Sequence, residues 1–237
     1  MSSSKPSDPT EAGAAVGKVY ATLRMTILDG EIPPETRVNI DAVARQVGVS
    51  QTPVREALQR LEGDGLLVYT PGRGYRTTPM LDLPGLRSLF EFRLLVEPWA
   101  ARTAATDRLS NPGPDLDAEV SWFEEVASKD GDVRQDMLAH DTRFHDRILV
   151  GAGNEVVRQA YAQTHCHLHV FRLSQVDADG AITIHEHRRI WAAIRDCDPS
   201  AAEVAMSEHI RNSFARSVRA FDGKGAASAG APLLPAR

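Results

Sequence analysis

Residues 49–58 read Val49-Ser50-Gln51-Thr52-Pro53-Val54-Arg55-Glu56-Ala57-Leu58, and this stretch predicts a helix with one buried and one polar face. The Ser50 hydroxyl can cap the first turn, where Pro53 is tolerated because its missing N–H has no intrahelical partner. The apolar residues recur at helical spacing: Val54, Ala57, Leu58 and Leu61. The outer face carries side chains that can donate hydrogen bonds to base edges and phosphates: Gln51, Thr52, Arg55 and Gln59.

The residues on either side of this helix extend the pattern to a small domain. A helix over Ile40–Val47 precedes it and stops at Gly48, so that only Gly48-Val49-Ser50 separates the two helices. An earlier helix carries the apolar stripe Val16, Val19, Tyr20, Leu23 and Ile27 and ends near Gly30. Two short strands, Leu66–Thr70 and Tyr75–Thr78, flank the turn at 71–74. This order predicts a winged helix-turn-helix, with Arg73 at the hairpin tip.

The stretch at 49–58, followed by Leu61, Gly65-Leu66-Leu67 and Gly72-Arg73-Gly74, resembles the DNA-binding head of the GntR family over residues 16–79. The resemblance implies that the following residues contact DNA: Arg37, Arg45, Ser50, Thr52, Arg55, Gly72, Arg73 and Gly74. The family usually has arginine at the position of Gln51. An amide suits adenine better than guanine, so the resemblance does not fix the operator preference. Winged helices also serve as protein-interaction modules, which is the alternative interpretation.

The charge distribution does not identify a nucleic-acid binder by itself. The formal net charge is −5, with eight Lys/Arg against seven Asp/Glu in residues 18–79 and 18 against 23 in residues 80–237. DNA binding must therefore come from the placement of individual arginines. The chain has two cysteines and no run of 18 apolar residues. We therefore expect a cytoplasmic protein without a membrane span.

A proline-bounded junction at 77–84 separates the head from a second domain. Residues 1–13 and 222–237 are expected to be disordered tails, leaving domains at 14–79 and 83–221. The second domain has helical periodicity near 83–106, 115–129, 132–150, 154–176, 184–196 and 199–221, with N-caps expected at Asn154, Thr183 and Asp198. The predicted fold class is mainly α, a winged helix-turn-helix followed by an all-α bundle.

Polar residues on apolar helix faces are the informative feature of this bundle. Asp141 and His145 lie one turn apart on the buried side of their helix, where a carboxylate is unfavourable unless it is paired or metal-bound. His187 and His209 lie eleven residues before and eleven after the turn at Asp198, which places them at one height, roughly 16 Å from that turn. One carboxylate and three imidazoles suit a divalent metal, zinc first, with nickel, iron and manganese as alternatives.

Other polar residues offer rival or additional sites. His165, His167 and His169 form a competing histidine cluster, but on one continuous helix His167 would point away from the other two. Arg93 lies on an apolar stripe and needs a carboxylate, either Glu97 or an incoming acid. Asn212 shares the face of His209, so it is expected either to line the site or to be a solvated amide.

The segments Phe92–Ala101, Asp141–His145, Glu186–Ile190 and Glu208–Ile210 resemble the FCD-type ligand-binding domain of the FadR subfamily. The resemblance implies a metal held by Asp141, His145, His187 and His209, and an organic-acid effector that reaches the metal and Arg93. We therefore expect a homodimeric regulator that reads a palindromic operator on double-stranded DNA and responds to a small carboxylate. A metal hydrolase carrying a DNA-binding head and a regulator with a purely structural metal are the alternatives.

Overall fold

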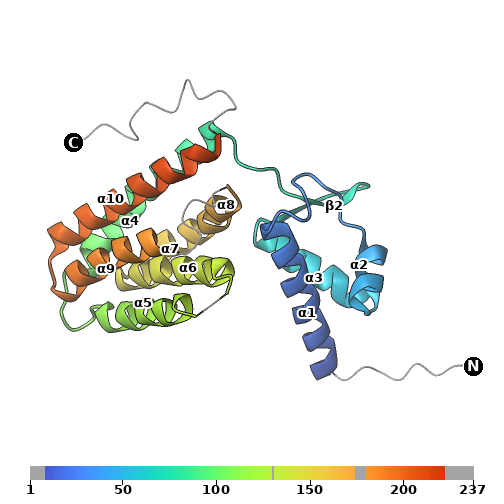
Figure 1. The fold of residues 1–237 in the computed structure, drawn as a ribbon, viewed down its shortest axis with the longest axis horizontal. Coiled ribbons are helices and arrows are strands. Elements are labelled where there is room, and N and C mark those ends of the chain that lie inside the picture. The colour runs from blue at the N-terminus through green and yellow to red at the C-terminus, as the bar shows by residue number, and fades with distance from the viewer. Residues whose placement is uncertain (1–8, 130, 174–179, 222–237) are drawn as a thin grey trace, which may run out of the picture. The chain divides into compact units, whose positions relative to one another are not determined.

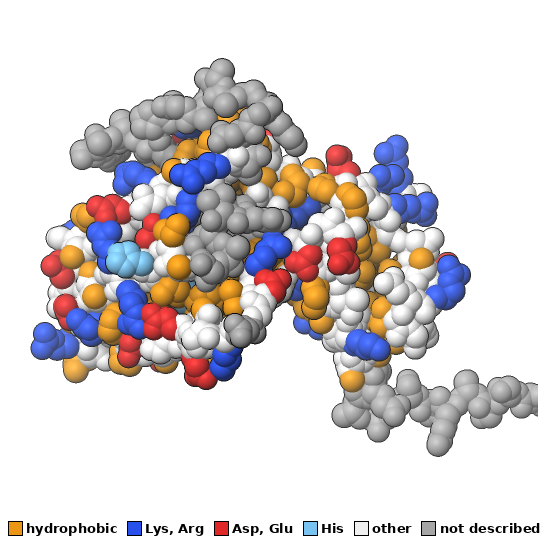
Figure 2. All heavy atoms as spheres, in the orientation of Figure 1, with side chains coloured by type: hydrophobic (Ala, Val, Ile, Leu, Met, Phe, Trp, Pro, Cys, Tyr) orange, Lys and Arg blue, Asp and Glu red, His pale blue; other side chains and the backbone are white. Residues whose placement is uncertain are grey.

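The computed structural model describes residues 9–129, 131–173 and 180–221. The chain divides into two compact units, Met1–Met80 and Leu81–Arg237 (Figure 1). This division falls inside the proline-bounded junction. Lys and Arg side chains are interspersed with Asp and Glu side chains over the visible face of each unit (Figure 2). Among the described residues, no helix has the length and apolar character that crossing a membrane requires.

The first unit contains three helices and a hairpin: α1 (Pro9–Leu28), α2 (Ile40–Val47), α3 (Gln51–Gly63), β1 (Leu67–Thr70) and β2 (Gly74–Thr77). α1 packs on α3, and the predicted apolar residues of both helices are buried between them, including Leu23, Ile27, Leu58 and Leu61. α1 begins at Pro9, so residues 9–13 are helical where we expected a tail. The remainder of that expected tail and all of 222–237 lie outside the described residues.

The turn between α2 and α3 has the geometry that its sequence predicts. Gly48 ends α2 with φ +74°, a left-handed conformation that favours glycine because it has no Cβ. The amides of Gly48 and Val49 both donate to the Ala44 carbonyl at 3.0 Å, which closes the helix end. Ser50 precedes α3 with an extended backbone, but its hydroxyl makes no capping hydrogen bond. The predicted position of Ser50 is therefore confirmed, while the predicted capping bond is not formed.

The second unit is a helical bundle followed by one 3₁₀ turn, η1 (Arg219–Phe221). Its helices are α4 (Leu83–Ala104), α5 (Gly113–Ala127), α6 (Arg134–Gly151), α7 (Glu155–Ala162), α8 (Cys166–Leu173), α9 (Ala181–Arg195) and α10 (Pro199–Val218). α10 runs antiparallel to α4, since the Phe90 ring contacts the Phe214 ring at one end and Arg102 pairs with Glu203 at the other. Leu86, Phe144, Ile190 and Met206 lie in the core between these helices.

Two helix boundaries differ from the prediction. The helix expected over 154–176 is interrupted between α7 and α8, where His165 has φ +46°, and residues 174–176 lie outside the described residues. α9 begins at Ala181 after Gly180, so Thr183 is a buried residue inside the helix rather than its N-cap. Gly180 has φ +73°, and a Cβ there would lie 2.7 Å from the Met137 sulfur. Asn154 and Asp198 cap α7 and α10 as predicted.

Candidate functional site

The outward face of α3 carries the polar residues that the sequence indicated. Gln51, Thr52 and Arg55 are all exposed. The Arg55 guanidinium donates to Gln51 Oε1 at 3.3 Å, and the Gln51 amide contacts the Asp41 carboxylate. Asp41 lies at the start of α2, so these contacts orient Gln51 from the neighbouring helix. The face presents amide and guanidinium donors, which are the groups that read base edges in the major groove.

Three further arginines of this unit are exposed: Arg37, Arg45 and Arg73. Within the described part of the chain, none of their side chains has a hydrogen-bond or ion-pair partner. Arg73 lies at the wing tip between Gly72 (φ +76°) and Gly74 (φ +79°), conformations that glycine adopts without strain. Cations without an internal partner are free to neutralise phosphates, which is how a domain with nearly balanced charge can bind DNA.

A compact cluster of metal-ligating side chains lies inside the second unit. Asp141 and His145 come from α6, His187 from α9 and His209 from α10. Each offers one ligand atom, and the four atoms lie within 4.8 Å of one another. Asp141 Oδ1 is 3.6 Å from His145 Nε2 and 3.5 Å from His187 Nε2. Ligands of a tetrahedral zinc lie about 3.3 Å apart, so these separations fit a first-row metal ion.

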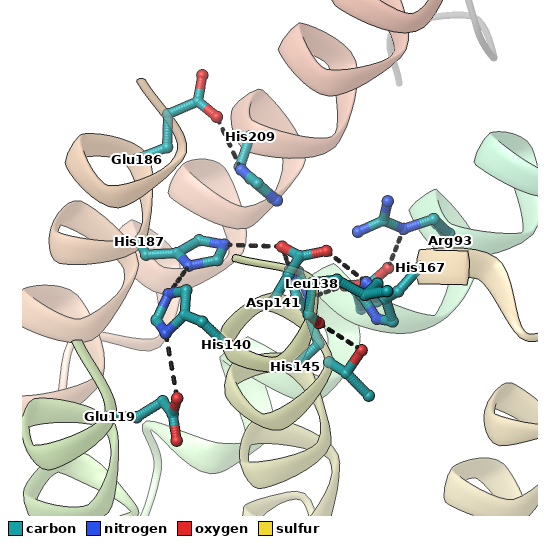
Figure 3. A network of polar contacts seen from close by, with 12 residues as sticks. Arg93, Glu119, Leu138, His140, Asp141, His145, His167, Glu186, His187 and His209 are labelled. Carbon is teal, nitrogen blue, oxygen red and sulfur yellow. Dashed lines mark hydrogen bonds and ion pairs between the residues drawn. The ribbon is translucent and has the colours of Figure 1, made fainter. Parts of the chain in front are cut away.

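The second nitrogen of each histidine has its own partner, and Figure 3 shows those of His187 and His209. His145 Nδ1 contacts the Glu97 carboxylate, and His209 Nδ1 lies 2.8 Å from Glu186 Oε2. His187 Nδ1 lies 2.9 Å from a further imidazole, that of His140. A histidine that ligates a metal usually donates its other N–H to such a partner, which fixes the ring and its tautomer. The three Nε2 atoms are thereby left for a common ion.

The buried ring nitrogens provide a test of whether an ion fits. His145 Nε2 and His187 Nε2 are buried and have no hydrogen-bond partner among the described residues. A buried polar atom without a partner is unfavourable by about 1–3 kcal/mol. A metal ion bound by the two nitrogens would remove this penalty at both. The donor set therefore fits the metal that the sequence predicts.

The protonation states of two of the four residues, His187 and Asp141, favour metal binding. Burial, reinforced by the neighbouring His209 and His145, holds the pKa of His187 well below its ordinary value, so this imidazole is neutral. Burial alone would raise the pKa of Asp141, but the charges and hydrogen bonds of His167 and His145 outweigh it and hold the pKa well below its usual range. A neutral imidazole and an ionised carboxylate are the forms that bind a metal. Burial alone would lower the pKa of His145, but the charges and hydrogen bonds of Glu97 and Asp141 outweigh it and raise the pKa, so this imidazole would have to release a proton when a metal binds.

His167 is a site residue that the sequence did not predict. Its Nδ1 lies 2.5 Å from Asp141 Oδ2, the oxygen that does not face His145 and His187. Its Nε2 lies 3.2 Å from the Tyr161 hydroxyl, which donates to Glu97 at 2.7 Å. The break between α7 and α8 turns His167 inward, whereas one continuous helix would have pointed it away from the site. Neither glycine nor proline marks this break in the sequence.

A cavity of about 90 Å³ adjoins Asp141, His167 and His209. Its wall combines apolar side chains with hydroxyl groups and one guanidinium: Met137, Leu138, Val170, Phe171, Thr183, Ser213, Arg216 and Ser217. Arg216 donates two hydrogen bonds of 2.9 Å to Glu186, the residue that also holds His209. The cavity can hold a small polar molecule beside the ligating cluster.

The two residues predicted to contact an effector differ in burial: Arg93 is buried and Asn212 is exposed. Arg93 is buried and donates to Glu97 at 2.6 Å, so the internal ion pair that the sequence left open is formed. Its Nη2 is buried without a hydrogen-bond partner in the described part of the chain. Asn212 is exposed and donates to Glu186 Oε1 at 2.9 Å. It does not line the 90 Å³ cavity, which favours the solvated amide of the two positions expected for it, and its contact with an effector stays a prediction. Together with Glu186 and Arg216 it lines a different pocket.

The fold and the cluster define a two-domain bacterial regulator, and the chain belongs to the GntR family, in the group with an FCD domain. The profile described as "Bacterial regulatory proteins, gntR family" matches residues 15–76, and the FCD domain profile matches residues 88–212. The protein is therefore a transcriptional regulator with a DNA-binding GntR domain and an FCD effector-binding domain.

Individual relatives agree with this assignment. A "Probable D-xylose utilization operon transcriptional repressor" of Paenarthrobacter nicotinovorans is 28% identical over 78% of this chain and 81% of the relative. The "HTH-type transcriptional repressor RspR" of Escherichia coli is 24% identical over 85% and 88%. The solved structure of E. coli McbR/YncC is similar in fold, with a TM-score of 0.66 at 19% identity over 87% and 98% of the two chains.

Proposed function

We propose that this protein binds a palindromic operator as a homodimer and that a small carboxylate bound beside a metal ion changes its operator affinity. The observation that carries the sensing part is the convergence of Asp141, His145, His187 and His209 next to a polar cavity. The reading head would contact DNA through Arg37, Arg45, Ser50, Gln51, Thr52 and Arg55 and through the wing at Gly72, Arg73 and Gly74.

The metal would be held by Asp141 Oδ1 and the Nε2 atoms of His145, His187 and His209. Zinc is the first expectation, with nickel, iron and manganese as alternatives, because imidazole nitrogen suits the first three and a carboxylate suits manganese. The bound ion would supply an open coordination position for an anionic oxygen. Asp141 and His209 belong to the cavity wall, so that position would be reached from the cavity.

The effector would be a small organic acid. The cavity wall contains the imidazole of His167 and the guanidinium of Arg216, which has five N–H donors and gives two of them to Glu186. Arg93 Nη2 is a buried donor without a hydrogen-bond partner in the described part of the chain, and a carboxylate would satisfy it. Arg93 is not part of the cavity wall, so this contact requires the acid to extend beyond the cavity. Val170 and Phe171 offer contacts to the apolar part of such an acid, and the small volume limits it to a few carbons.

A palindromic operator requires two heads. One face of α4 carries two exposed apolar side chains one turn apart, Leu95 (68% exposed) and Trp99 (38% exposed). We propose that this face contributes to the homodimer. Light scattering on the wild type and on Leu95→Arg tests it: a monomeric variant of a dimeric wild type supports the face, and an unchanged dimer removes it.

Membership of the GntR family favours a regulatory function over the alternative of a metal hydrolase. Its members are transcriptional regulators, which are generally not enzymes. The decisive experiment combines elemental analysis and mass spectrometry of the purified protein with operator binding in the presence of a panel of small carboxylic acids. We expect one divalent metal per chain and a change in operator affinity with some acid of the panel. Metal-loaded protein that responds to none of the acids would remove the sensing proposal and leave a structural metal.

A further inference from the structure

Beside the ligating cluster, the structure contains a chain of three polar groups that leads away from it: Glu119, His140 and His187 (Figure 3). His187 Nδ1 lies 2.9 Å from His140 Nε2, and His140 Nδ1 lies 3.2 Å from Glu119 Oε1. Both imidazoles are fully buried, and Glu119 is 4% exposed. His145 and His209 each contact a carboxylate directly, whereas here a second imidazole stands between the ligating ring and the carboxylate.

The ring planes in this chain are fixed by aromatic packing. His187 stacks on Phe144 with a centroid distance of 4.0 Å and an interplanar angle of 6°. His140 stacks on Phe123 at 5.0 Å and 24°. A rotated ring would lose both its stacking and its hydrogen bond. The two imidazoles are therefore held edge to edge.

When His187 offers a lone pair on Nε2, only one arrangement of protons allows both hydrogen bonds, from His187 to His140 and from His140 to Glu119. The His187 proton must then be on Nδ1, where it is donated to His140 Nε2. His140 must carry its own proton on Nδ1, where it is donated to Glu119. Neutral imidazole has one donor and one acceptor nitrogen, so each ring uses both. The carboxylate at the far end thereby selects the tautomer of the metal-facing ring.

Glu119 is held as an anion by two arginines. Arg143 donates to both of its oxygens at 2.9 and 2.8 Å, and Arg147 contacts Oε2. Burial alone would raise the pKa of Glu119, but the hydrogen bonds and charges of Arg143 and Arg147 outweigh it and lower the pKa. Arg143 also lies over the Trp122 ring at 4.3 Å. The carboxylate is thus ionised and fixed, as an acceptor at the end of such a chain must be.

We propose that His140, anchored by Glu119, is a positioning residue that fixes the orientation and tautomer of His187 and so sets the metal affinity of the site. This proposal rests on the proposed metal site. His140 does not face the ion, and neither comparisons nor spacing in the sequence assign it a role. Supporting partners of metal-ligating histidines typically contribute ten- to hundredfold in metal affinity, and we expect an effect of that size.

The test compares two substitutions at position 140 with a matched control. In His140→Gln the amide oxygen can still accept from His187 and the amide nitrogen can donate to Glu119, so most of the affinity is retained. In His140→Leu neither bond forms, and zinc affinity measured by chelator competition falls ten- to hundredfold. His185→Gln, an exposed position two residues from His187, serves as control and leaves the affinity unchanged.

A second readout does not depend on metal. In metal-free protein, nitrogen-15 NMR of the imidazoles should show His187 and His140 protonated on Nδ1, and His140→Leu should move the His187 proton toward Nε2. A merely space-filling His140 would leave that tautomer unchanged. If His140→Leu does not fold, the zinc affinities of His140→Gln and Glu119→Gln are compared instead. We then expect Glu119→Gln to weaken zinc binding and His140→Gln to change it little.

The possible outcomes separate this proposal from the proposed function. Unchanged zinc affinity in a folded His140→Leu, or a wild-type His187 protonated on Nε2, overturns the positioning role. A wild type that binds zinc and keeps the expected tautomers but responds to no acid overturns only the sensing proposal. A wild type without metal affinity overturns both the metal site and this proposal.

Discussion

The two units of this protein place their functional side chains in opposite environments. In the first unit Arg37, Arg45 and Arg73 are exposed and have no side-chain partner in the described chain. In the second unit His140, His145 and His187 are buried, and their ring nitrogens contact one another or a carboxylate. The first arrangement suits a large polyanion that arrives from solvent. The second suits a small ion that is held away from water.

The comparison predicts that loss of the ligating set leaves operator binding in the absence of acid intact, and the largest effect is expected at Asp141. Asp141→Asn removes the only carboxylate of the ligating set, so the loss of zinc affinity should exceed the ten- to hundredfold loss typical of a supporting partner. Operator affinity without added acid should change little. Metal content by elemental analysis and operator binding by fluorescence anisotropy check both statements.

The control for that experiment is Asp146→Asn. Asp146 lies on the same helix and pairs with Arg158 at 2.7 Å. The Asp146→Asn variant should keep the full metal content, because the Asp146 carboxylate is not one of the four ligands. Equal metal content in the two variants would contradict the ligating role of Asp141.

The next effect belongs to the head. Arg55→Ala removes an exposed guanidinium from the outer face of α3 and should reduce operator affinity by about 1–3 kcal/mol, a factor of roughly 5 to 150. Arg102→Ala is the control: it removes an exposed arginine of the second unit that pairs with Glu203, and the operator affinity should stay unchanged. Anisotropy titrations at one fixed salt concentration measure both. A wild-type affinity in Arg55→Ala would remove this residue from the reading surface.

A smaller effect concerns the turn between α2 and α3. Gly48→Ala places a Cβ in a left-handed conformation, with no neighbouring atom within 4 Å to clash with it. The expected result is a loss of about 1–2 kcal/mol from the conformation alone. Chemical denaturation should show this loss in the transition of the first unit, with the second unit unchanged. An unchanged first transition would mean that the turn relaxes without penalty.

The smallest effect is a pH dependence of the head. The Tyr20 hydroxyl donates to Asp64 at 2.6 Å, and burial together with this bond raises the pKa of Tyr20 to about 12. The folded state therefore keeps the proton more tightly than the unfolded state does. The resulting stability is complete below about pH 10 and is lost between pH 10 and 12. We expect a loss on the order of 1 kcal/mol for this partly exposed residue. Tyr20→Phe should flatten that part of the stability profile.

The head could be predicted closely because its signals are local. Gly48, Pro53 and the apolar spacing each act within a few residues, and α2 has the predicted bounds of Ile40–Val47. Asp141 and His145 were found for a similar reason, since they lie one turn apart on one helix. His187 and His209 required only the assumption that two antiparallel helices meet at Asp198.

The parts that could not be predicted depend on contacts between distant segments. The break before α8 lies at Gln163-Thr164-His165, which contains no helix-breaking residue, and it is held by buried contacts of Cys166 and His167. The role of His140 depends on Glu119 from another helix. A weak signal existed, because His140 lies four residues before the buried Phe144 and so shares its face. The two positions expected for Asn212 could not be separated from the sequence, because a shared helix face does not say whether a side chain reaches a cavity or stays exposed.

The short helix α8 contributes to the wall of the cavity without contributing to the ligating set. It supplies Val170 and Phe171 to the cavity wall but none of the four ligating residues, which come from α6, α9 and α10. Exchanging these two side chains should alter which molecules are recognised while leaving the grip on the ion intact. Substitution of these two positions can therefore be separated from substitution of His167, the residue of the same helix that contacts Asp141.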